Sequence, residues 1–342
     1  MATPRILVAG LSGGSGKTLV SLGLASAWRS FGREVAVFKK GPDYIDAAWL
    51  STAAGSPCRN LDLFLMSPQA VLESFAARTT TADAAVIEGN RGLYDGFDGE
   101  GMTSTAELAK LLRAPVVLAV DCTKATRTVA ALVLGCQTLD PEVPLRGVIL
   151  NRVAGARHEA VVRDAINQIC GLPVVGAIGK IPRHSLPERH LGLVPPQEHG
   201  GQGAALREVA AIAGRHLDLE KLWHIASSAP PLPLPGPSVG DEAGPRPEVV
   251  NIGIFRDRAF QFYYPENLEA LAREGARLIE ISPLNDVELP AVDALYIGGG
   301  FPETAAQELA DNATFRSSLR QAIDGDLPVY AECGGAVYLG ET

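Results

Sequence analysis

Short apolar runs alternate with longer segments of helical period along the first part of the chain. The runs are ILVAG at 6–10, VAVFK at 35–39, AAVIEG at 84–89, PVVLAVD at 115–121, GVILNR at 147–152 and PVVGAIG at 173–179. Runs rich in valine, isoleucine and leucine, without polar alternation, are typical of parallel strands that helices cover on both faces. The pattern therefore predicts a doubly wound α/β domain with a mostly parallel sheet.

A proline-rich segment interrupts this pattern. Residues 230–247 contain seven prolines in eighteen positions, which excludes a helix or a central strand and indicates an extended linker. The apolar runs then restart as VVNIGIF at 249–255, ARLIEIS at 276–282, ALYIGGG at 294–300 and PVYAEC at 328–333. We therefore predict a first domain at 1–228, a linker at 229–248 and a second doubly wound α/β domain at 249–342.

Composition narrows the class of protein. The 342 residues carry a net charge of −9, which argues against general binding to nucleic acid or to an anionic membrane. The five cysteines are far apart and odd in number, so neither a disulfide framework nor a zinc site is indicated. No segment is apolar over the length that spans a bilayer, and the first apolar run is a strand rather than a signal peptide. We expect a cytoplasmic protein that acts on small molecules.

The first apolar run leads into GGSGKTLVSLGL at 13–24. A strand, a glycine-rich turn and a helix in this order direct backbone N–H groups and the positive end of the helix at anionic phosphates. Lys17 is predicted to reach the β- and γ-phosphates of ATP, and Thr18 to hold Mg²⁺. The other predicted nucleotide-binding positions in the loop are Gly13, Gly14, Ser15 and Gly16. Leu11 stands where the strict pattern has glycine, and this variant spacing resembles MinD-like and dethiobiotin-synthetase-like ATPases.

Carboxylates follow the apolar runs, at the edge where a parallel sheet binds its ligands. Asp43 and Asp46 lie in GPDYID after the second run, and Glu88 ends the third run. Carboxylates beside transferring phosphates act through Mg²⁺, so we predict Asp43 and Glu88 as metal ligands. For Asp46 and Asp95, a helix cap or a turn is an equal alternative. Asn151 is predicted to contact the purine, and an Asn turn is the alternative.

The second domain contains a candidate nucleophile. Cys333 lies in PVYAECGGAVYLG, where an apolar strand runs into a glycine-rich turn and a helix. This is the pattern of a nucleophile elbow, in which a tight turn exposes the reactive side chain. Gly299 and Gly300 end another strand, and their N–H groups are predicted to form an oxyanion hole with that of Gly334. The other cysteines are expected to be buried hydrophobic residues.

Several motifs together resemble the cobyrinate a,c-diamide synthase family. In the second domain they are FYYPENLEAL, ISPLNDVELPAVDALYIGGGFPE and PVYAECGG, which look like the family's glutaminase half, a class I-like glutamine amidotransferase. In the first domain they are GGSGKT, FKKGPDYIDAAW, EGNRGLYDG, STAELAKLLRAPVVLAVD, GVILNRV and PERHLGLV, in the family's order. The resemblance covers nearly the whole chain outside the linker.

This resemblance implies an ATP- and Mg²⁺-dependent ligase that amidates the a and c acetate carboxylates of cobyrinate in cobalamin biosynthesis. Each carboxylate becomes an acyl phosphate, and ammonia, released from glutamine through a thioester at Cys333, displaces the phosphate. The residues that the resemblance assigns to phosphorylation and to the intermediate are Asp43, Asp46 and Glu88. Those that it assigns to tetrapyrrole placement are Tyr44, Ile45 and Asp95. A homodimer is kept as an expectation, because such folds commonly dimerise.

The chain departs from the family in two places. It ends at Thr342, nine residues after Cys333, whereas the family continues and there supplies the His and Glu that activate the thiol. We therefore expect a C-terminally truncated fragment with an incomplete amidotransferase domain, which at best uses free ammonia. Asn90 and Arg91 stand where the family carries small or apolar residues, and Arg91 is predicted to pair with an additional substrate carboxylate. Sirohaem or nickel-sirohydrochlorin therefore stays open as the alternative substrate.

Hypotheses from other classes also stay open. One is a MinD-like ATPase switch whose second domain is a binding module. Ser12, in place of the signature lysine, and the elbow at Cys333 count against it. Another is an inactive, truncated relic. His184 and His190 lie in a family-like loop, and we expect both to be structural.

Overall fold

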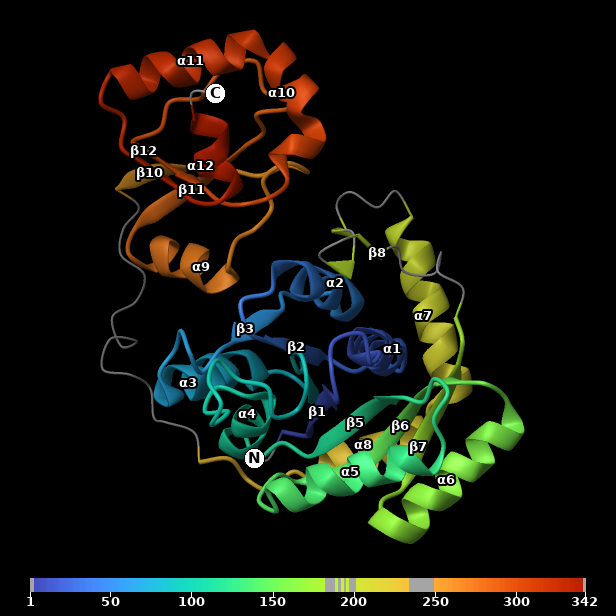
Figure 1. Ribbon diagram of the computed structural model, residues 1–342. Helices are drawn as coiled ribbons and strands as arrows, with labels where there is room; N and C mark the ends of the chain where they lie inside the picture. Colours follow the sequence, from blue (N-terminus) through green and yellow to red (C-terminus); the bar gives the residue numbers. More distant parts are fainter. Residues whose placement is uncertain are drawn as a thin grey trace. The chain divides into compact units, whose positions relative to one another are not determined.

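The computed structural model describes residues 3–181, 188–189, 192–193, 195–196, 201–233 and 249–340. The chain divides into two compact units, Met1–Gly236 and Pro237–Thr342 (Figure 1). The change from one unit to the other falls inside the predicted linker, most of which lies outside the described residues. The exact domain bounds stay a prediction.

The N-terminal unit is built on a seven-stranded sheet in the order β3-β2-β4-β1-β5-β6-β7. Its strands are β1 (Arg5–Gly10), β2 (Val35–Lys40), β3 (Arg59–Leu61), β4 (Ala84–Glu88), β5 (Val116–Asp121), β6 (Leu145–Val153) and β7 (Val174–Gly179). Every neighbouring pair is parallel, so all the carboxyl ends meet at one edge. The six apolar runs are thus confirmed as strands, and β3 is an edge strand that the pattern did not predict.

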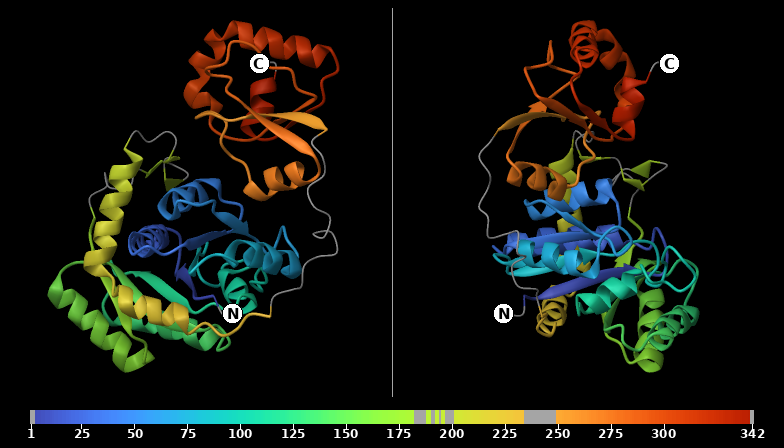
Figure 2. Two further views of the ribbon diagram at one scale, coloured as in Figure 1. Left: turned by 180° about the vertical axis from the view of Figure 1, so that it is seen from behind. Right: turned by 90° about the vertical axis from the view of Figure 1, so that its left-hand side faces the viewer.

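Helices cover both faces of this sheet (Figures 1 and 2). On one face lie α1 (Lys17–Ser30), α2 (Tyr44–Ala54), α7 (Gln202–His216) and α8 (Leu219–Ser227). On the other lie α3 (Pro68–Thr79), α4 (Thr105–Leu111), α5 (Arg127–Leu139) and α6 (Ala156–Cys170). Ile6 and Val8 point into the first layer and Leu7 and Ala9 into the second, and all four are fully buried. This two-sided burial explains why the strand sequences are apolar without alternation.

A short antiparallel pair, β8 (Glu188–Arg189) with β9 (Gly192–Leu193), lies in the same unit. Among the helices of the described residues, none is long and apolar enough to cross a bilayer.

The C-terminal unit has a four-stranded parallel sheet in the order β11-β10-β12-β13. Its strands are β10 (Val250–Phe255), β11 (Ala276–Ile281), β12 (Ala294–Ile297) and β13 (Val329–Ala331). Its helices are α9 (Pro265–Arg273), the 3₁₀ turn η2 (Pro302–Ala305), α10 (Ala306–Asp311), α11 (Ala313–Asp324) and α12 (Gly334–Leu339). The helix α9 packs on one face, and α10, α11 and α12 pack on the other. The predicted second α/β fold is confirmed.

Candidate active sites in the two units

The loop between β1 and α1 is shaped to enclose an anion. Gly14 and Gly16 adopt φ angles of 72° and 101°, which glycine reaches without steric cost. The ammonium of Lys17 donates to Ser12 O at 2.9 Å and to Arg91 O at 2.8 Å, so it is held across the loop. The N–H groups that begin α1 have no partner inside the helix and are available for phosphate oxygens.

Asn151, at the carboxyl end of β6, supports this loop from behind. Its Nδ2 donates to Ser15 O at 2.9 Å, and its Oδ1 accepts from the N–H of Arg152 at 2.9 Å. A Cβ at Gly16 would lie 2.3 Å from the same Nδ2, so only glycine fits there. The amide therefore fixes the backbone of the phosphate loop, and its predicted contact with the purine stays a prediction.

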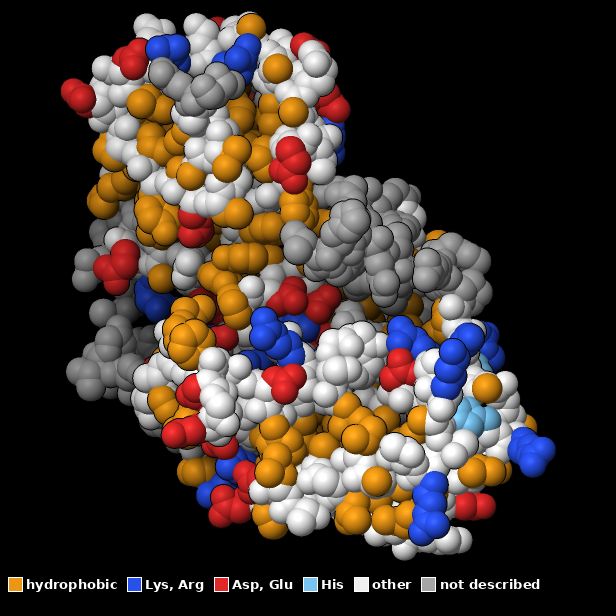
Figure 3. All heavy atoms as spheres, viewed as in Figure 1, with side chains coloured by type: hydrophobic (Ala, Val, Ile, Leu, Met, Phe, Trp, Pro, Cys, Tyr) orange, Lys and Arg blue, Asp and Glu red, His pale blue; other side chains and the backbone are white. Residues whose placement is uncertain are grey.

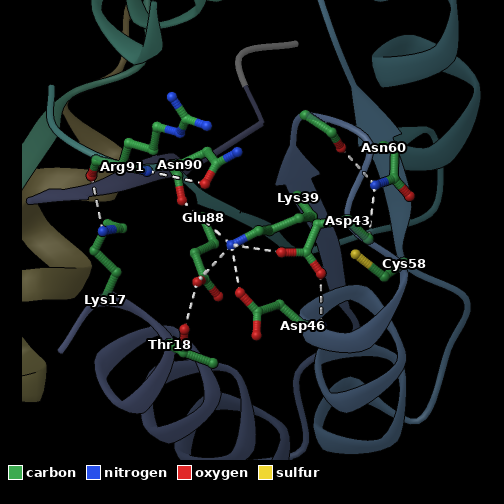
Figure 4. A network of polar contacts seen from close by, with 12 residues as sticks. Lys17, Thr18, Lys39, Asp43, Asp46, Cys58, Asn60, Glu88, Asn90 and Arg91 are labelled. Atoms are coloured by element: carbon green, nitrogen blue, oxygen red, sulfur yellow. Dashed lines mark hydrogen bonds and ion pairs between the residues drawn. The ribbon is translucent and has the colours of Figure 1, made fainter. Parts of the chain in front are cut away.

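The predicted carboxylates converge on one lysine that the sequence pattern did not predict (Figure 4). Lys39, at the end of β2, is 1% exposed. Its Nζ lies 2.7 Å from Asp46 Oδ2, 2.8 Å from Glu88 Oε1 and 3.9 Å from Asp43 Oδ2. Thr18 joins the same group, because its hydroxyl donates to Glu88 Oε1 at 2.7 Å. The phosphate loop and the carboxylates thus form one connected site.

Burial sets the electrostatics of this site. Glu88 is fully buried, which raises its pKa to about 7 although the positive charge of Lys39 opposes the shift. Burial alone would lower the pKa of Lys39, but the negative charges of Glu88, Asp46 and Asp43 raise it above its ordinary value. Burial lowers the pKa of Lys17, and the charge of Lys39 adds to that shift. The site therefore holds an ammonium that stays protonated at neutral pH beside a carboxyl that is close to its titration point.

Two observations fit the predicted Mg²⁺. Oε2 of Glu88 is buried and has no hydrogen-bond partner among the described residues. The hydroxyl of Thr18 lies on the other oxygen of the same carboxylate, and hard oxygen donors are the ligands that Mg²⁺ prefers. In the described part of the chain, no group of three or more His, Cys, Asp or Glu side chains is arranged to hold a metal. A site with few protein ligands is usual where substrate phosphates complete the coordination.

The other predicted residues of this site have structural roles as well. Asp43 caps α2, since its Oδ1 accepts from the N–H of Asp46 at 2.9 Å. Asp95 closes a turn, since its Oδ2 accepts from the N–H of Gly92 at 2.7 Å. Tyr44 and Ile45 open α2 and are half-buried beside these groups. Their predicted contacts with a tetrapyrrole stay predictions, as do the metal ligand role of Asp43 and the substrate role of Asp95.

One supporting residue of the site was not predicted. Asn60, on the short strand β3, donates through Nδ2 to Gly41 O at 2.7 Å and to Asp43 O at 2.9 Å. It therefore holds the GPD loop that leads into α2. His184 and His190, which we expected to be structural, lie outside the described residues.

Cys333 occupies a strained turn in the C-terminal unit. It follows β13, adopts φ 50° and ψ −119°, and directly precedes α12. Its side chain is exposed. A Cβ at Gly335 would lie 2.5 Å from Ile297 O, so the helix packs against β12 only because glycine stands there. A positive φ at a non-glycine residue that presents an exposed thiol is the geometry of a nucleophile elbow.

The glycine loop after β12 lies against this elbow. A Cβ at Gly299 would lie 3.3 Å from the Cβ of Cys333, and a Cβ at Gly300 would lie 2.0 Å from Ala259 O. The N–H groups of Gln261 and Phe262 both donate to Gly299 O at 3.0 Å. The glycine loop is therefore held close to the thiol. The predicted oxyanion-hole donors, which include Gly334, stay predictions.

Tyr263 is a third residue, after Lys39 and Asn60, that the sequence pattern did not predict. Its hydroxyl donates to Phe255 O at 2.6 Å and accepts from the N–H of Gly298 at 2.8 Å. It thereby ties the end of β10 to the glycine loop. The aromatic motif FQFYY marks the segment, but nothing in its spacing indicates which ring is buried.

Comparison with known proteins identifies both units. The CobQ/CobB/MinD/ParA nucleotide binding domain matches residues 6–193, and the CobB/CobQ-like glutamine amidotransferase domain matches residues 251–342. A cobyrinate a,c-diamide synthase of Magnetococcus marinus is 45% identical over 99% of this chain and 73% of its own length. The enzyme of the same name from Dehalococcoides mccartyi (strain 195) is 43% identical over 100% of this chain and 74% of its own length. A hydrogenobyrinate a,c-diamide synthase of Streptomyces coelicolor is 42% identical over 99% of this chain and 76% of its own length.

These matches confirm the nucleotide-binding domain and the glutamine amidotransferase domain that were predicted from the motifs. They also confirm the predicted class of enzyme, an ATP-dependent ligase that uses glutamine. The chain belongs to the cobyrinate a,c-diamide synthase family.

Proposed function

We propose that the protein amidates the a and c acetate carboxylates of cobyrinate in cobalamin biosynthesis, with ATP as the energy source. The observation that carries this proposal is the network at the phosphate loop, in which Lys39 pairs with Asp46 and Glu88 and the hydroxyl of Thr18 donates to Glu88. A carboxylate is a poor acyl donor, because its oxygen is a poor leaving group. Phosphorylation supplies a leaving group. The site joins a phosphate loop to buried charged side chains, which can stabilise the acyl phosphate.

In the first step a substrate carboxylate oxygen attacks the γ-phosphorus of ATP. A carboxylate–phosphorus bond forms, the bond to the β,γ-bridging oxygen breaks, and ADP leaves. Lys17 and the N–H groups at the start of α1 hold the phosphates. Thr18 and Glu88 would hold Mg²⁺, which would supply positive charge that offsets the charge on the phosphates. Lys39 holds Asp46 and Glu88 in place.

In the second step ammonia attacks the acyl carbon and phosphate leaves with its bonding electrons. One proton of the attacking nitrogen is lost, and an amide remains. We propose that the ammonia comes from glutamine. The thiolate of Cys333 attacks the amide carbon of glutamine, ammonia is released, and water then hydrolyses the thioester to glutamate. The exposed elbow and the glycine loop beside it support this assignment.

A cytoplasmic location remains part of the proposal. All five cysteines are free thiols, which suits a reducing compartment. A homodimer also remains a prediction.

Mass spectrometry of the tetrapyrrole tests the proposal. The protein is incubated with MgATP, with cobyrinate or sirohaem in parallel, and with glutamine or ammonium as the nitrogen source. We expect cobyrinate to gain two amides, and a preference for sirohaem would reassign the substrate. Lys17→Ala should abolish amidation, whereas Cys333→Ala should leave the ammonium-supported reaction unchanged. ATP binding without any amide product would contradict the proposed function.

A further inference from the structure

Two exposed phenylalanines pack against each other at the carboxyl edge of the N-terminal sheet. The ring centroids of Phe64 and Phe97 lie 4.8 Å apart, and the ring planes are inclined at 32°. The two side chains are 60% and 77% exposed, so the pair lies at the surface and not in the core. Leu65 and Met102, which are 60% and 61% exposed, belong to the same two loops. These four side chains are named the apolar surface.

Hydrogen bonds fix the loops that carry the apolar surface. Oδ1 of Asp62, at the end of β3, accepts from the N–H of Phe64 at 2.6 Å, and its carbonyl accepts from the N–H of Met66 at 2.9 Å. The N–H of Phe97 donates to Thr103 Oγ1 at 3.0 Å. Because both rings stand on loops that are already ordered, a ligand that binds them loses little conformational entropy.

The segment that carries Phe97 also contacts the phosphate loop. It follows β4, and β3 and β4 run parallel to β1 and β2, so their carboxyl ends share one edge. Near its start, the N–H of Leu93 donates to Gly10 O at 2.8 Å, and the carbonyl of Arg91 accepts from Lys17 at 2.8 Å. Figure 3 shows hydrophobic side chains gathered at the surface beside α3, next to basic side chains. The apolar surface is therefore continuous with the proposed active site through this segment.

The size of the apolar surface suits a small molecule better than a protein. An aromatic side chain buries about 150–250 Å² when it is fully covered. Four side chains that are already partly covered thus present a few hundred Å², whereas each partner contributes roughly 800 Å² to a stable protein interface. An exposed apolar patch of this extent on a soluble domain often marks a ligand-binding site.

We propose that the apolar surface binds one face of the tetrapyrrole macrocycle. This inference rests on the proposed function, which makes the substrate a large ring with apolar faces and carboxylates on its rim. Aromatic side chains contact such a face through dispersion and through removal of apolar area from water. A ring that lies on Phe64 and Phe97 keeps its carboxylates at the rim in water. One of these carboxylates can then extend along the segment 91–97 toward the phosphate loop.

Equilibrium binding of cobyrinate to the full chain, measured by isothermal titration, tests this inference. Phe97→Ala and Phe64→Ala should each weaken cobyrinate binding by about tenfold, because an aromatic contact with the ring is lost. Phe97→Trp should keep most of the affinity, since it keeps an aromatic face at the same place. The affinity for ATP should be the same in all three variants and in the wild type.

The matched control is Phe31→Ala. Phe31 is 66% exposed and follows α1, so it lies at the opposite edge of the sheet. This variant should bind cobyrinate as the wild type does. Thermal unfolding separates ligand binding from a structural role: because the side chains of Phe64 and Phe97 are exposed, their replacement should leave the melting temperature nearly unchanged.

Three results would overturn the inference. Wild-type affinity for cobyrinate in both Phe64→Ala and Phe97→Ala would exclude contact between the ring and the apolar surface. Weaker ATP binding would assign the loops to the nucleotide. A wild-type dimer that Phe97→Ala dissociates in sedimentation velocity would make the surface an interface between two copies of the chain.

Failure of the proposed function gives a different set of results. If the wild-type protein binds cobyrinate through Phe64 and Phe97 but forms no amide from ammonium and MgATP, the apolar surface stands and the proposed reaction is rejected. If the wild-type protein binds no tetrapyrrole, the proposed function is rejected, and the role of the apolar surface with it.

Discussion

Nδ2 of Asn151 donates a hydrogen bond to the carbonyl of Ser15 at 2.9 Å. This contact joins the carboxyl end of β6 to the phosphate loop across the centre of the sheet edge. It adds a fixed support to a loop whose glycines would otherwise allow many backbone conformations. Because it holds the backbone, it should matter for any ligand that the loop binds.

Asn151→Ala should weaken the binding of both ATP and tripolyphosphate by roughly tenfold, because the loop loses its buried support. Isothermal titration with the two ligands checks this. Asn167→Ala, at an exposed position of α6, is the control and should have no effect. A loss confined to ATP would show that the side chain acts on the purine instead.

Lys39→Met should destabilise the N-terminal unit by about 3–5 kcal/mol, because it leaves Asp46 and Glu88 without their buried cation. Urea unfolding followed by tryptophan fluorescence measures this change. Adding Glu88→Gln to Lys39→Met should recover part of the loss, since one unpaired charge is then removed. Equal stability of Lys39→Met and wild type would contradict the role assigned to the ammonium.

Glu88 should make the stability of the ligand-free protein depend on pH. Burial raises its pKa from 4.5 to about 7, so the folded state binds this proton more tightly than the unfolded state does. The contribution of protonated Glu88 to the free energy of unfolding is therefore complete below about pH 4.5 and is lost as the pH rises through about 7. Relative to Glu88→Gln, the melting temperature of the wild type should fall by several degrees between about pH 5 and pH 8.

Differential scanning fluorimetry across this pH range checks the effect of Glu88. Glu142→Gln, at an exposed position, should follow the wild type at every pH. If the melting temperatures of the wild type and Glu88→Gln changed in parallel with pH, the carboxyl of Glu88 would not titrate in this range.

Tyr263→Phe should loosen the glycine loop beside Cys333. It leaves the carbonyl of Phe255 and the N–H of Gly298 without their buried partner, at a cost of about 1–3 kcal/mol. Hydrogen exchange at Gly298 should become faster, while ammonium-supported amidation should stay unchanged. Tyr330→Phe, at an exposed position, is the control. Unchanged exchange at Gly298 would reject the role of the Tyr263 hydroxyl.

The strands could be predicted because two-sided burial leaves a strong, continuous apolar signal. The three residues of β3 are too few to give such a signal, so Asn60 and its support of the GPD loop could not be found. Lys39 was missed for a different reason. A lysine at the end of a strand usually reaches solvent, and only the approach of β4 and α2 shows that this one is enclosed by carboxylates.

The sequence motifs indicated where the candidate site lies, but they did not determine the role of each residue in it. Asp43 was predicted as a metal ligand because carboxylates gather near phosphates, yet in the fold its Oδ1 also caps α2. Sequence spacing cannot separate these roles, because a cap and a ligand can use the two oxygens of one carboxylate. Tyr263 shows the same limit, since FQFYY contains four aromatic residues and the sequence does not show which hydroxyl is buried.

The backbone contacts of Arg91 have a consequence for how substrate preference can change. Lys17 and Asn90 hold this residue through its carbonyl and its N–H, and neither contact depends on the side chain. Residue 91 can therefore be replaced by other residues that tolerate a positive φ. The hydrogen bonds to its backbone, and with them the phosphate loop, would stay in place. On the prediction that the Arg91 side chain pairs with a substrate carboxylate, its replacement would change which acid is bound and would leave the phosphate loop intact.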